Sequence, residues 1–339
     1  MNRFDWKWYL KDIKQDKPVK VFTTFSCGGG SSMGYKRAGF EVIGNVEIDP
    51  KMNAMYCKNH HPKYNYCMDL REFNKLENIP EELVGIDILD GSPPCTTFSI
   101  AGRREENWGK KKKFKEGQAE QTLDDLFFVF LDTVEFLRPK IVIAENVVGL
   151  VAGNAKGYVN LIIKRFHELG YAVQLFKLNG AFMDVPQARE RVFFVANRCD
   201  FPKLTLSFKD DVIEFGKVRS EKGVPLGEKG TMSKALLEQA TESDVKLEYI
   251  TKRIAGVKGK LFSHMIVRDD QVTPTVTSGG AYYRLYDKML FSSEDFTAVQ
   301  SFPQDYDYNG NNVQYVCGMS VPPNMMANIA TEVYEQWLK

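Results

Sequence analysis

Short apolar runs alternate with amphipathic helical patterns through the first 197 residues, and this alternation constrains the fold more than any other feature. Apolar runs of about four to eight residues predict buried strands, and apolar positions that recur every three or four residues predict helices. Strands and helices in regular alternation are typical of an α/β protein with a doubly wound, parallel sheet. The strands are expected near 19–25, 42–47, 86–89, 141–144, 171–178 and 192–196, and the helices near 31–38, 123–134 and 155–169.

The pattern changes after residue 197. Residues 198–286 hold many Lys, Glu, Gly and Thr with weak periodicity, and helical patterns return only near 293–301 and from 324 onward. We therefore predict a main α/β domain over 1–197, a smaller inserted domain over 198–286, and a C-terminal segment over 287–339 that returns to the main domain.

Composition excludes several classes of protein. The chain has 339 residues, of which 43% are hydrophobic, so a disordered or fibrous protein is not expected. The longest apolar runs, such as 126–131, are too short to span a membrane, and the N-terminus has no apolar signal segment. No two of the six cysteines form a C-x-x-C pair, which argues against a zinc site and for free thiols. A cytoplasmic protein without membrane contact is expected. The net charge of +1 neither supports nor excludes nucleic-acid binding.

A glycine-rich turn separates the first strand from the first helix. Residues 25–34 read Phe-Ser-Cys-Gly-Gly-Gly-Ser-Ser-Met-Gly. Consecutive glycines let the backbone approach a ligand closely, and the helix N-terminus offers free N–H groups. Glu47 ends the next strand 17 residues after Gly30. A carboxylate at about this distance binds ribose hydroxyls in nucleotide-type folds. The alternative is a tight turn followed by a solvated Glu47.

A rigid turn that contains a thiol follows the third strand. Ser92, Pro93, Pro94 and Cys95 lie where the carboxyl ends of parallel strands bind ligands. The two prolines restrict the backbone and would hold the Cys95 side chain in a fixed position. Cys95 is therefore a candidate nucleophile. A small buried cysteine in a rigid turn is the alternative.

Two further segments place charged groups at the same edge. Glu145 and Asn146 directly follow the apolar strand 141–144, so Glu145 is either a desolvated functional carboxylate or the first exposed residue. Before the last strand, the period of two along an extended chain places Arg189 and Arg191 on one face. Paired arginines could clamp an anion or brace a carboxylate. A charged strand edge is the alternative.

A basic loop follows the candidate nucleophile. Residues 103–116 contain seven basic and three acidic side chains, a local net charge of +4, together with Trp108. Such a run is commonly solvated, but its position beside Cys95 makes it a candidate lid that contacts phosphates.

In this order and at these distances, the segments resemble the DNA cytosine-5 methyltransferases of bacteria and phages. The motifs that carry the resemblance are Pro-Pro-Cys at 93–95, Glu-Asn-Val at 145–147 and Gln-x-Arg-x-Arg at 187–191, and the similarity extends from residue 25 to about 330. The resemblance implies S-adenosyl-L-methionine as cofactor and a Rossmann-like methyltransferase fold. It also implies that 198–286 is the family's target-recognition domain, inserted into the catalytic domain.

The resemblance also implies roles for individual residues. Cys95 would add to carbon 6 of a cytosine flipped out of duplex DNA, so that carbon 5 can attack the methyl group. Glu145 would hydrogen-bond the ring nitrogen and the exocyclic amine, Arg191 would contact the base oxygen, and Arg189 would brace the site near Glu145. Residues implied for the cofactor are Phe25, Gly28, Gly30, Glu47, Ile48, Asp69, Leu126 and Val321. Residues implied for the substrate are Ser92, Pro93, Pro94, Asn146 and Gln187.

Several positions depart from the family's pattern. Thr96 follows the nucleophile where the family has Gln, and Met319 stands near the C-terminus where the family has Asn. Thr23 or Thr24 stands where the family has Asp before the glycine-rich turn, and Cys27 is unusual within that turn.

Several other readings share part of this pattern. A tRNA cytosine-5 methyltransferase has the same catalytic set, and a DNA-binding pseudoenzyme would use the same scaffold. An amino-methyltransferase would have an aromatic residue after the prolines instead of Cys95. A nicotinamide oxidoreductase would need a G-x-G-x-x-G turn, which residues 28–34 fit poorly. The expected partner is duplex DNA, with a cognate restriction endonuclease in the cell, and the chain is expected to be a monomer.

Overall fold

The computed structural model describes residues 3–94, 111–112, 121–122, 126–151, 156–209, 211–227, 231–255, 261 and 263–339. The chain forms two compact units. The first, the sheet unit, consists of Ile13–Asn179, Glu190–Ser207 and Met325–Lys339. The other, the second unit, consists of Met1–Asp12, Gly180–Arg189 and Phe208–Asn324.

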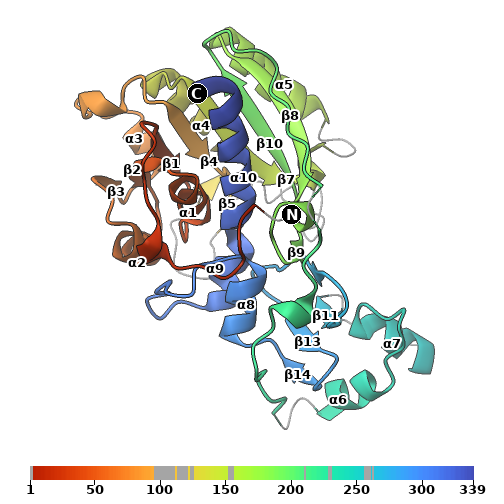
Figure 1. Cartoon of the computed structure of the whole chain (residues 1–339). Helices are drawn as coiled ribbons and strands as arrows, with labels where there is room; N and C mark the ends of the chain where they lie inside the picture. Colours follow the sequence, from red (N-terminus) through yellow and green to blue (C-terminus); the bar gives the residue numbers. More distant parts are fainter. Residues whose placement is uncertain are drawn as a thin grey trace. The chain divides into compact units, whose positions relative to one another are not determined.

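A seven-stranded sheet of order β3-β2-β1-β4-β7-β10-β8 forms the centre of the sheet unit (Figure 1). The five strands from β3 to β7 in this order are parallel, and β10 runs antiparallel to both of its neighbours. The predicted α/β fold is confirmed, with the addition of one antiparallel strand. The strands are β1 (Lys20–Thr24), β2 (Glu41–Val46), β3 (Tyr64–Tyr66), β4 (Ile88–Gly91), β7 (Ile141–Val147), β8 (Ala172–Asn179) and β10 (Glu190–Asn197).

The antiparallel strand follows from the connection that precedes it. A parallel strand needs a crossover, usually a helix, to bring the chain back to the same edge of the sheet. Between β8 and β10 the chain instead has the ten residues Gly180–Arg189, which belong to the second unit. The N–H of Gly180 donates to the carbonyl of Arg189 over 3.0 Å, so the two ends of the connection meet. The chain therefore reverses direction without a crossover.

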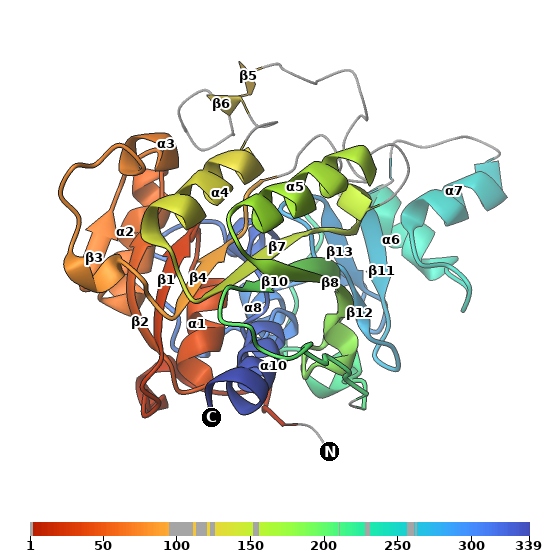
Figure 2. The same ribbon diagram turned by 90° about the horizontal axis from the view of Figure 1, so that it is seen from above.

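Helices cover both faces of the sheet (Figure 2). The helices α4 and α5 lie on one face, and α1 and α10 lie on the other. The helix α4 ends where Arg138 adopts a left-handed φ of 50°, one residue before Pro139. No helix in the described part of the chain is long and apolar enough to cross a bilayer. The helices of this unit are α1 (Gly30–Arg37), α2 (Pro50–His60), α3 (Leu70–Phe73), α4 (Leu126–Leu137), α5 (Lys156–Glu168) and α10 (Pro323–Val333), the last from Met325 on.

The main hydrophobic core lies between the sheet and the helices α4 and α5. The strands contribute aromatic and branched side chains such as Phe22 and Phe194, and the helices contribute side chains such as Phe127, Phe130 and Phe166. Phe127 and Phe194 meet edge to face with ring centroids 5.1 Å apart. Each fully buried side chain of this size stabilises the fold by roughly 2–3 kcal/mol.

The predicted basic loop at 103–116 is described only at Lys111 and Lys112. These two residues form β5 (Lys111–Lys112), which pairs antiparallel with β6 (Gln121–Thr122). Cys95, Thr96 and Trp108 lie outside the described residues.

Small sheets and short helices make up the second unit. A three-stranded sheet has the order β11-β13-β14, and β9 pairs in parallel with β12. Residues 198–207 lie instead with the sheet unit, where the Trp337 indole donates to the carbonyl of Pro202 over 2.9 Å. The elements are β9 (Gln187–Ala188), α6 (Thr231–Glu238), α7 (Leu247–Ala255), β11 (His264–Val267), β12 (Thr273–Pro274), β13 (Ala281–Arg284), β14 (Met289–Leu290), α8 (Ser293–Val299) and α9 (Val313–Met319).

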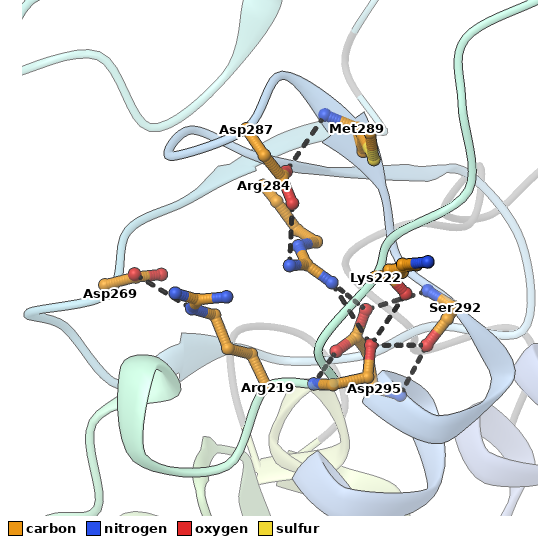
Figure 3. Close-up of polar contacts among 9 residues, drawn as sticks. Arg219, Lys222, Asp269, Arg284, Asp287, Met289, Ser292 and Asp295 are labelled. Carbon is orange, nitrogen blue, oxygen red and sulfur yellow. Dashed lines mark hydrogen bonds and ion pairs between the residues drawn. The ribbon is translucent and has the colours of Figure 1, made fainter.

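A buried arginine holds three segments of the second unit together (Figure 3). Arg284 is fully buried at the end of β13, and its guanidinium pairs with Asp287 at 2.7 Å and with Asp295 at 3.3 Å. Asp295 also accepts the N–H of Ser220 at 2.7 Å and forms a capping box with Ser292 at the start of α8. A buried guanidinium is tolerated only where carboxylates and hydrogen bonds replace its water, as they do here.

We predict that Asp295→Ala lowers the free energy of unfolding by about 3–5 kcal/mol, because it removes one of the two carboxylates that compensate the buried Arg284 together with the capping box of α8. Urea unfolding measures this change. Lys75→Ala is the control, because the ion pair of Lys75 with Glu72 is exposed and is expected to add little. Equal losses in both variants would show that the buried network does not stabilise the second unit.

Candidate active site

The strand order reverses between β1 and β4, and the residues after these strands form the candidate site. From β1 the chain proceeds to β2 and β3 on one side, and β4 then begins on the other side. In open α/β sheets the crevice at the carboxyl ends of such strands binds ligands. The segments that leave β1, β2, β4 and β7 at this edge are the ones for which the sequence predicts a site.

The glycine-rich turn after β1 is tightly wound. Phe25 and Cys27 have left-handed φ angles of 53° and 43°, and Gly29 has a φ of 73°. A Cβ atom on Gly29 would lie 2.2 Å from Nε2 of His60, which is buried on α2. Only glycine fits this position, and the turn thereby brings the buried backbone of Gly28 and Gly30 to the start of α1.

Glu47 ties this turn to the end of β2. Its carboxyl group accepts the N–H of Cys27 at 2.7 Å and the N–H of Asp49 at 2.9 Å. Burial raises the pKa of Glu47 above its ordinary value, while these backbone N–H groups act in the opposite direction. Each carboxylate oxygen can accept a second hydrogen bond, so Glu47 retains acceptor capacity for a ligand hydroxyl.

The other predicted cofactor residues lie in four segments of the chain. Ile48 is half-buried directly after Glu47, and Leu126 is buried at the start of α4. Asp69 is the N-cap of α3, where it accepts the N–H of Arg71 at 2.8 Å and pairs with the Arg71 guanidinium. Val321 is buried in the second unit.

An amide side chain anchors the proline segment after β4. Nδ2 of Asn146 donates to the carbonyl of Pro93 over 3.1 Å. Ser92 and Pro94 are half-buried on either side of Pro93. The predicted substrate residues Asn146 and Pro93 are thus in direct contact, and this contact fixes the backbone two residues before Cys95.

Glu145 and Arg191 form an ion pair on neighbouring strands. Nε of Arg191 lies 2.7 Å from Oε1 of Glu145, and both side chains are less than one-sixth exposed. In the register of β7 with β10, Arg191 lies opposite Val147, so the two side chains meet diagonally on one face. A charged donor and a charged acceptor are therefore held side by side at the sheet edge, where they could hydrogen-bond polar atoms on the edge of a ring.

The expectation that Arg189 and Arg191 share the face of one strand is wrong. Arg189 lies between β9 and β10, two strands that belong to different sheets, so the period of two does not hold across it. Arg189 is buried in the second unit, where its guanidinium donates to the carbonyls of Val276 and Gly318 over 2.9 Å each. The arginine that braces Glu145 is Arg191.

Gln187 also lies within the second unit. Its fully buried amide donates to Gln300 at 2.8 Å and accepts the N–H of Val276 at 2.9 Å. Gln187 and Arg189 therefore both fasten the β8–β10 connection to the segment around Val276.

Sequence reasoning missed a row of buried polar side chains one step inside the sheet edge. Thr23 on β1 pairs in register with Asn45 on β2 and with Asp90 on β4. All three side chains are buried, and the Tyr35 hydroxyl on α1 donates to Asp90 over 3.0 Å. A sequence signal existed, because Asp90 closes an apolar strand just as Glu47 and Glu145 do.

Comparison with known proteins identifies the family to which the chain belongs. Residues 19–335 match the family of C-5 cytosine-specific DNA methylases. The chain belongs to this family. Its reaction is therefore the methylation of cytosine at carbon 5 in DNA, and it is an enzyme.

Curated relatives and solved structures agree with the family. The chain is 29% identical to the type II methyltransferase M.Sau96I of Staphylococcus aureus over 96% of this chain and 78% of the relative. It is 27% identical to M1.HphI of Haemophilus parahaemolyticus over 91% of this chain and 85% of the relative. A prophage-encoded protein of E. coli, described as a DNA modification methyltransferase, shares the fold with a TM-score of 0.67 at 19% identity, over 95% of this chain and 100% of that one.

We predict that Gly29→Ala destabilises the methylase by about 1–3 kcal/mol more than Gly85→Ala. Both glycines have φ near 70°, but a Cβ at Gly85 meets nothing within 4 Å, whereas a Cβ at Gly29 overlaps the ring of His60. The difference between the two variants therefore isolates the overlap from the backbone strain. It is measured by urea unfolding, and equal losses would contradict the fit of the turn against α2.

Proposed function

We propose that the chain transfers the methyl group of S-adenosylmethionine to carbon 5 of a cytosine flipped out of a specific duplex DNA sequence, through a covalent adduct between Cys95 and carbon 6. The observation that carries the proposal is the ion pair of Glu145 with Arg191 at the edge where Asn146 anchors the Pro93–Pro94 segment. These contacts place a hydrogen-bonding pair and the backbone that leads into Cys95 at the ends of neighbouring strands.

The residues around the glycine-rich turn fit S-adenosylmethionine. The turn leaves no side chain between Gly28 and the start of α1, and Glu47 keeps acceptor capacity for a ribose hydroxyl. When bound, this cofactor supplies an electrophilic methyl group. We assign Ile48 to the adenine face and Asp69 to the adenine amine. The remaining residues assigned to the cofactor pocket are Phe25, Gly30, Leu126 and Val321.

Cys95 and Glu145 are the two residues proposed to activate the cytosine ring. The Cys95 thiolate forms a bond to carbon 6, and the electron pair released into the ring makes carbon 5 nucleophilic. Glu145, as the carboxylic acid, donates a hydrogen bond to the ring nitrogen and accepts one from the exocyclic amine, which offsets the negative charge that develops on the ring. Arg191 contacts the base oxygen while it holds Glu145 in place. After methyl transfer a base removes the proton from carbon 5, and the bond to Cys95 breaks.

Sequence recognition is assigned to residues 198–286, and the basic loop 103–116 is assigned to the phosphates beside the flipped base. Type II methyltransferases among the relatives favour a setting in which a restriction endonuclease cleaves the same sequence. We further propose that the enzyme acts as a monomer in the cytoplasm.

Unmethylated plasmid incubated with the protein and S-adenosylmethionine, followed by bisulfite sequencing, tests the proposal. Protected cytosines within one short recurring motif are the expected result. An absence of protected cytosines, with cofactor binding confirmed, would overturn it. The same assay on tRNA and a search for DNA binding without turnover would then distinguish the two alternatives.

We predict that Cys95→Ser abolishes methyl transfer and leaves S-adenosylmethionine binding nearly unchanged, since a serine hydroxyl is a far weaker nucleophile than a thiolate. Glu145→Gln is expected to slow single-turnover transfer by roughly 10² or more. The transfer of tritium-labelled methyl groups to DNA measures the reaction, and calorimetry measures the binding of S-adenosylmethionine. Methyl transfer by the serine variant would refute the covalent step.

We predict that Glu47→Gln weakens S-adenosylmethionine binding by roughly 10- to 100-fold, because an amide replaces a charged acceptor. Binding to the unaltered enzyme should also weaken as the pH falls toward the raised pKa of Glu47, because the protonated carboxyl loses acceptor capacity. Calorimetry measures both effects. Glu72→Gln, an exposed carboxyl on α3, is the control and should bind normally.

A further inference from the structure

Asp90 lies inside the sheet directly behind the candidate active site. In the parallel register of β4 with β7, Asp90 is opposite Ile143, and Glu145 is two residues further along β7 on the same face. Strand spacing and rise separate the backbones at Asp90 and Glu145 by roughly 8 Å. The carboxyl groups of Glu145 and Asp90 thus lie on the same face of the sheet, Glu145 at the active-site edge and Asp90 further inside the sheet.

Hydroxyl groups surround Asp90, and no cation pairs with it among the described residues. Its side chain is 2% exposed. The Tyr35 hydroxyl, itself fully buried, donates to Oδ1 over 3.0 Å, and Ser31 on the same helix also hydrogen-bonds the carboxyl. Other polar groups in its vicinity are the hydroxyl of Thr24, which donates to the Asp90 carbonyl, and that of Tyr56 on α2.

This environment favours the protonated acid. Burial raises the pKa of Asp90 to about 8, the hydrogen bonds from Tyr35 and Ser31 lower it, and the negative charge of Glu145 raises it further. Arg284 in the second unit shows the contrast, because a buried charge there is matched by two carboxylates. Asp90 has hydroxyl partners that a neutral acid can satisfy.

We propose that Asp90 is a positioning residue for methyl transfer: its carboxyl stays protonated while the enzyme works, so that the interior of the sheet next to the active site carries no negative charge, and its ionisation inhibits the reaction at alkaline pH. This inference rests on the proposed function, in which Glu145 offsets charge that develops on the cytosine ring. A negative charge on Asp90 opposes that development, and for a charge separation of roughly 8 Å at an effective dielectric constant of about 20 it should slow transfer by roughly 10- to 30-fold.

Single-turnover methylation of plasmid DNA as a function of pH tests the proposal. In the unaltered enzyme the rate should fall by roughly 10- to 30-fold as the pH rises through about 8. Asp90→Asn, which mimics the neutral acid, should lose this fall. Tyr35→Phe removes a bond that lowers the pKa of Asp90, so the fall should move to higher pH.

Lys36→Met is the matched control. Lys36 lies on α1 next to Tyr35, donates to the His60 carbonyl over 3.0 Å, and has a pKa that burial lowers to about 8. Its titration falls in the same range as that of Asp90, but its substitution should leave the alkaline fall in place. A fall that disappears in Lys36→Met and persists in Asp90→Asn would overturn the proposal.

Infrared difference spectroscopy at neutral pH separates this inference from the proposed function. The carbonyl stretch of a protonated carboxylic acid should be present in the unaltered enzyme and absent in Asp90→Asn, whether or not the preparation methylates DNA. A spectrum without this band would show that Asp90 is ionised and would overturn the proposal. If the band is present but the enzyme methylates no DNA, Asp90 is protonated as inferred, and the proposed function is refuted instead.

Discussion

The structure depends on the pairing of β1 with two parallel neighbours. Because β2 lies on one side of β1 and β4 on the other, the segments that leave β1 and β4 turn toward opposite halves of the sheet. The crevice between them needs no further element to form it. The glycine-rich turn, Glu47, the proline segment and Glu145 all take their positions from the ends of these strands.

The sequence was sufficient for four of the five strands in the parallel part of the sheet, and it missed β3, which has only three residues. Strands such as β4 and β7 begin with apolar residues that are buried on both faces, and the apolar residues of α4 recur at a regular helical spacing. Both patterns can be recognised from residues that are neighbours in the sequence. Glu47 and Glu145 stood out because a carboxylate ends an apolar run. Asp90 ends such a run too, but the sequence analysis assigned it no role.

The rest of the fold depends on contacts that are distant in the sequence. β9 and β12 have two residues each and exist only because they pair with each other across 86 residues. No window around Arg189 can reveal that pairing, and for this reason the period of two wrongly placed Arg189 and Arg191 on one face. β11, β13 and β14 are similarly short, and the buried partners of Arg284 come from segments on both sides of it.

The arrangement of the two units along the chain has a consequence for exchanging the second unit between relatives. The chain passes from one unit to the other after residues 12, 179, 189, 207 and 324, so the second unit is assembled from three separate stretches. A chimera that transplants only 208–324 would bring a foreign β12 to the resident β9 and foreign carbonyls to the resident Arg189. The smallest transferable part of the second unit therefore includes the ten residues between β8 and β10, although they lie outside its longest stretch.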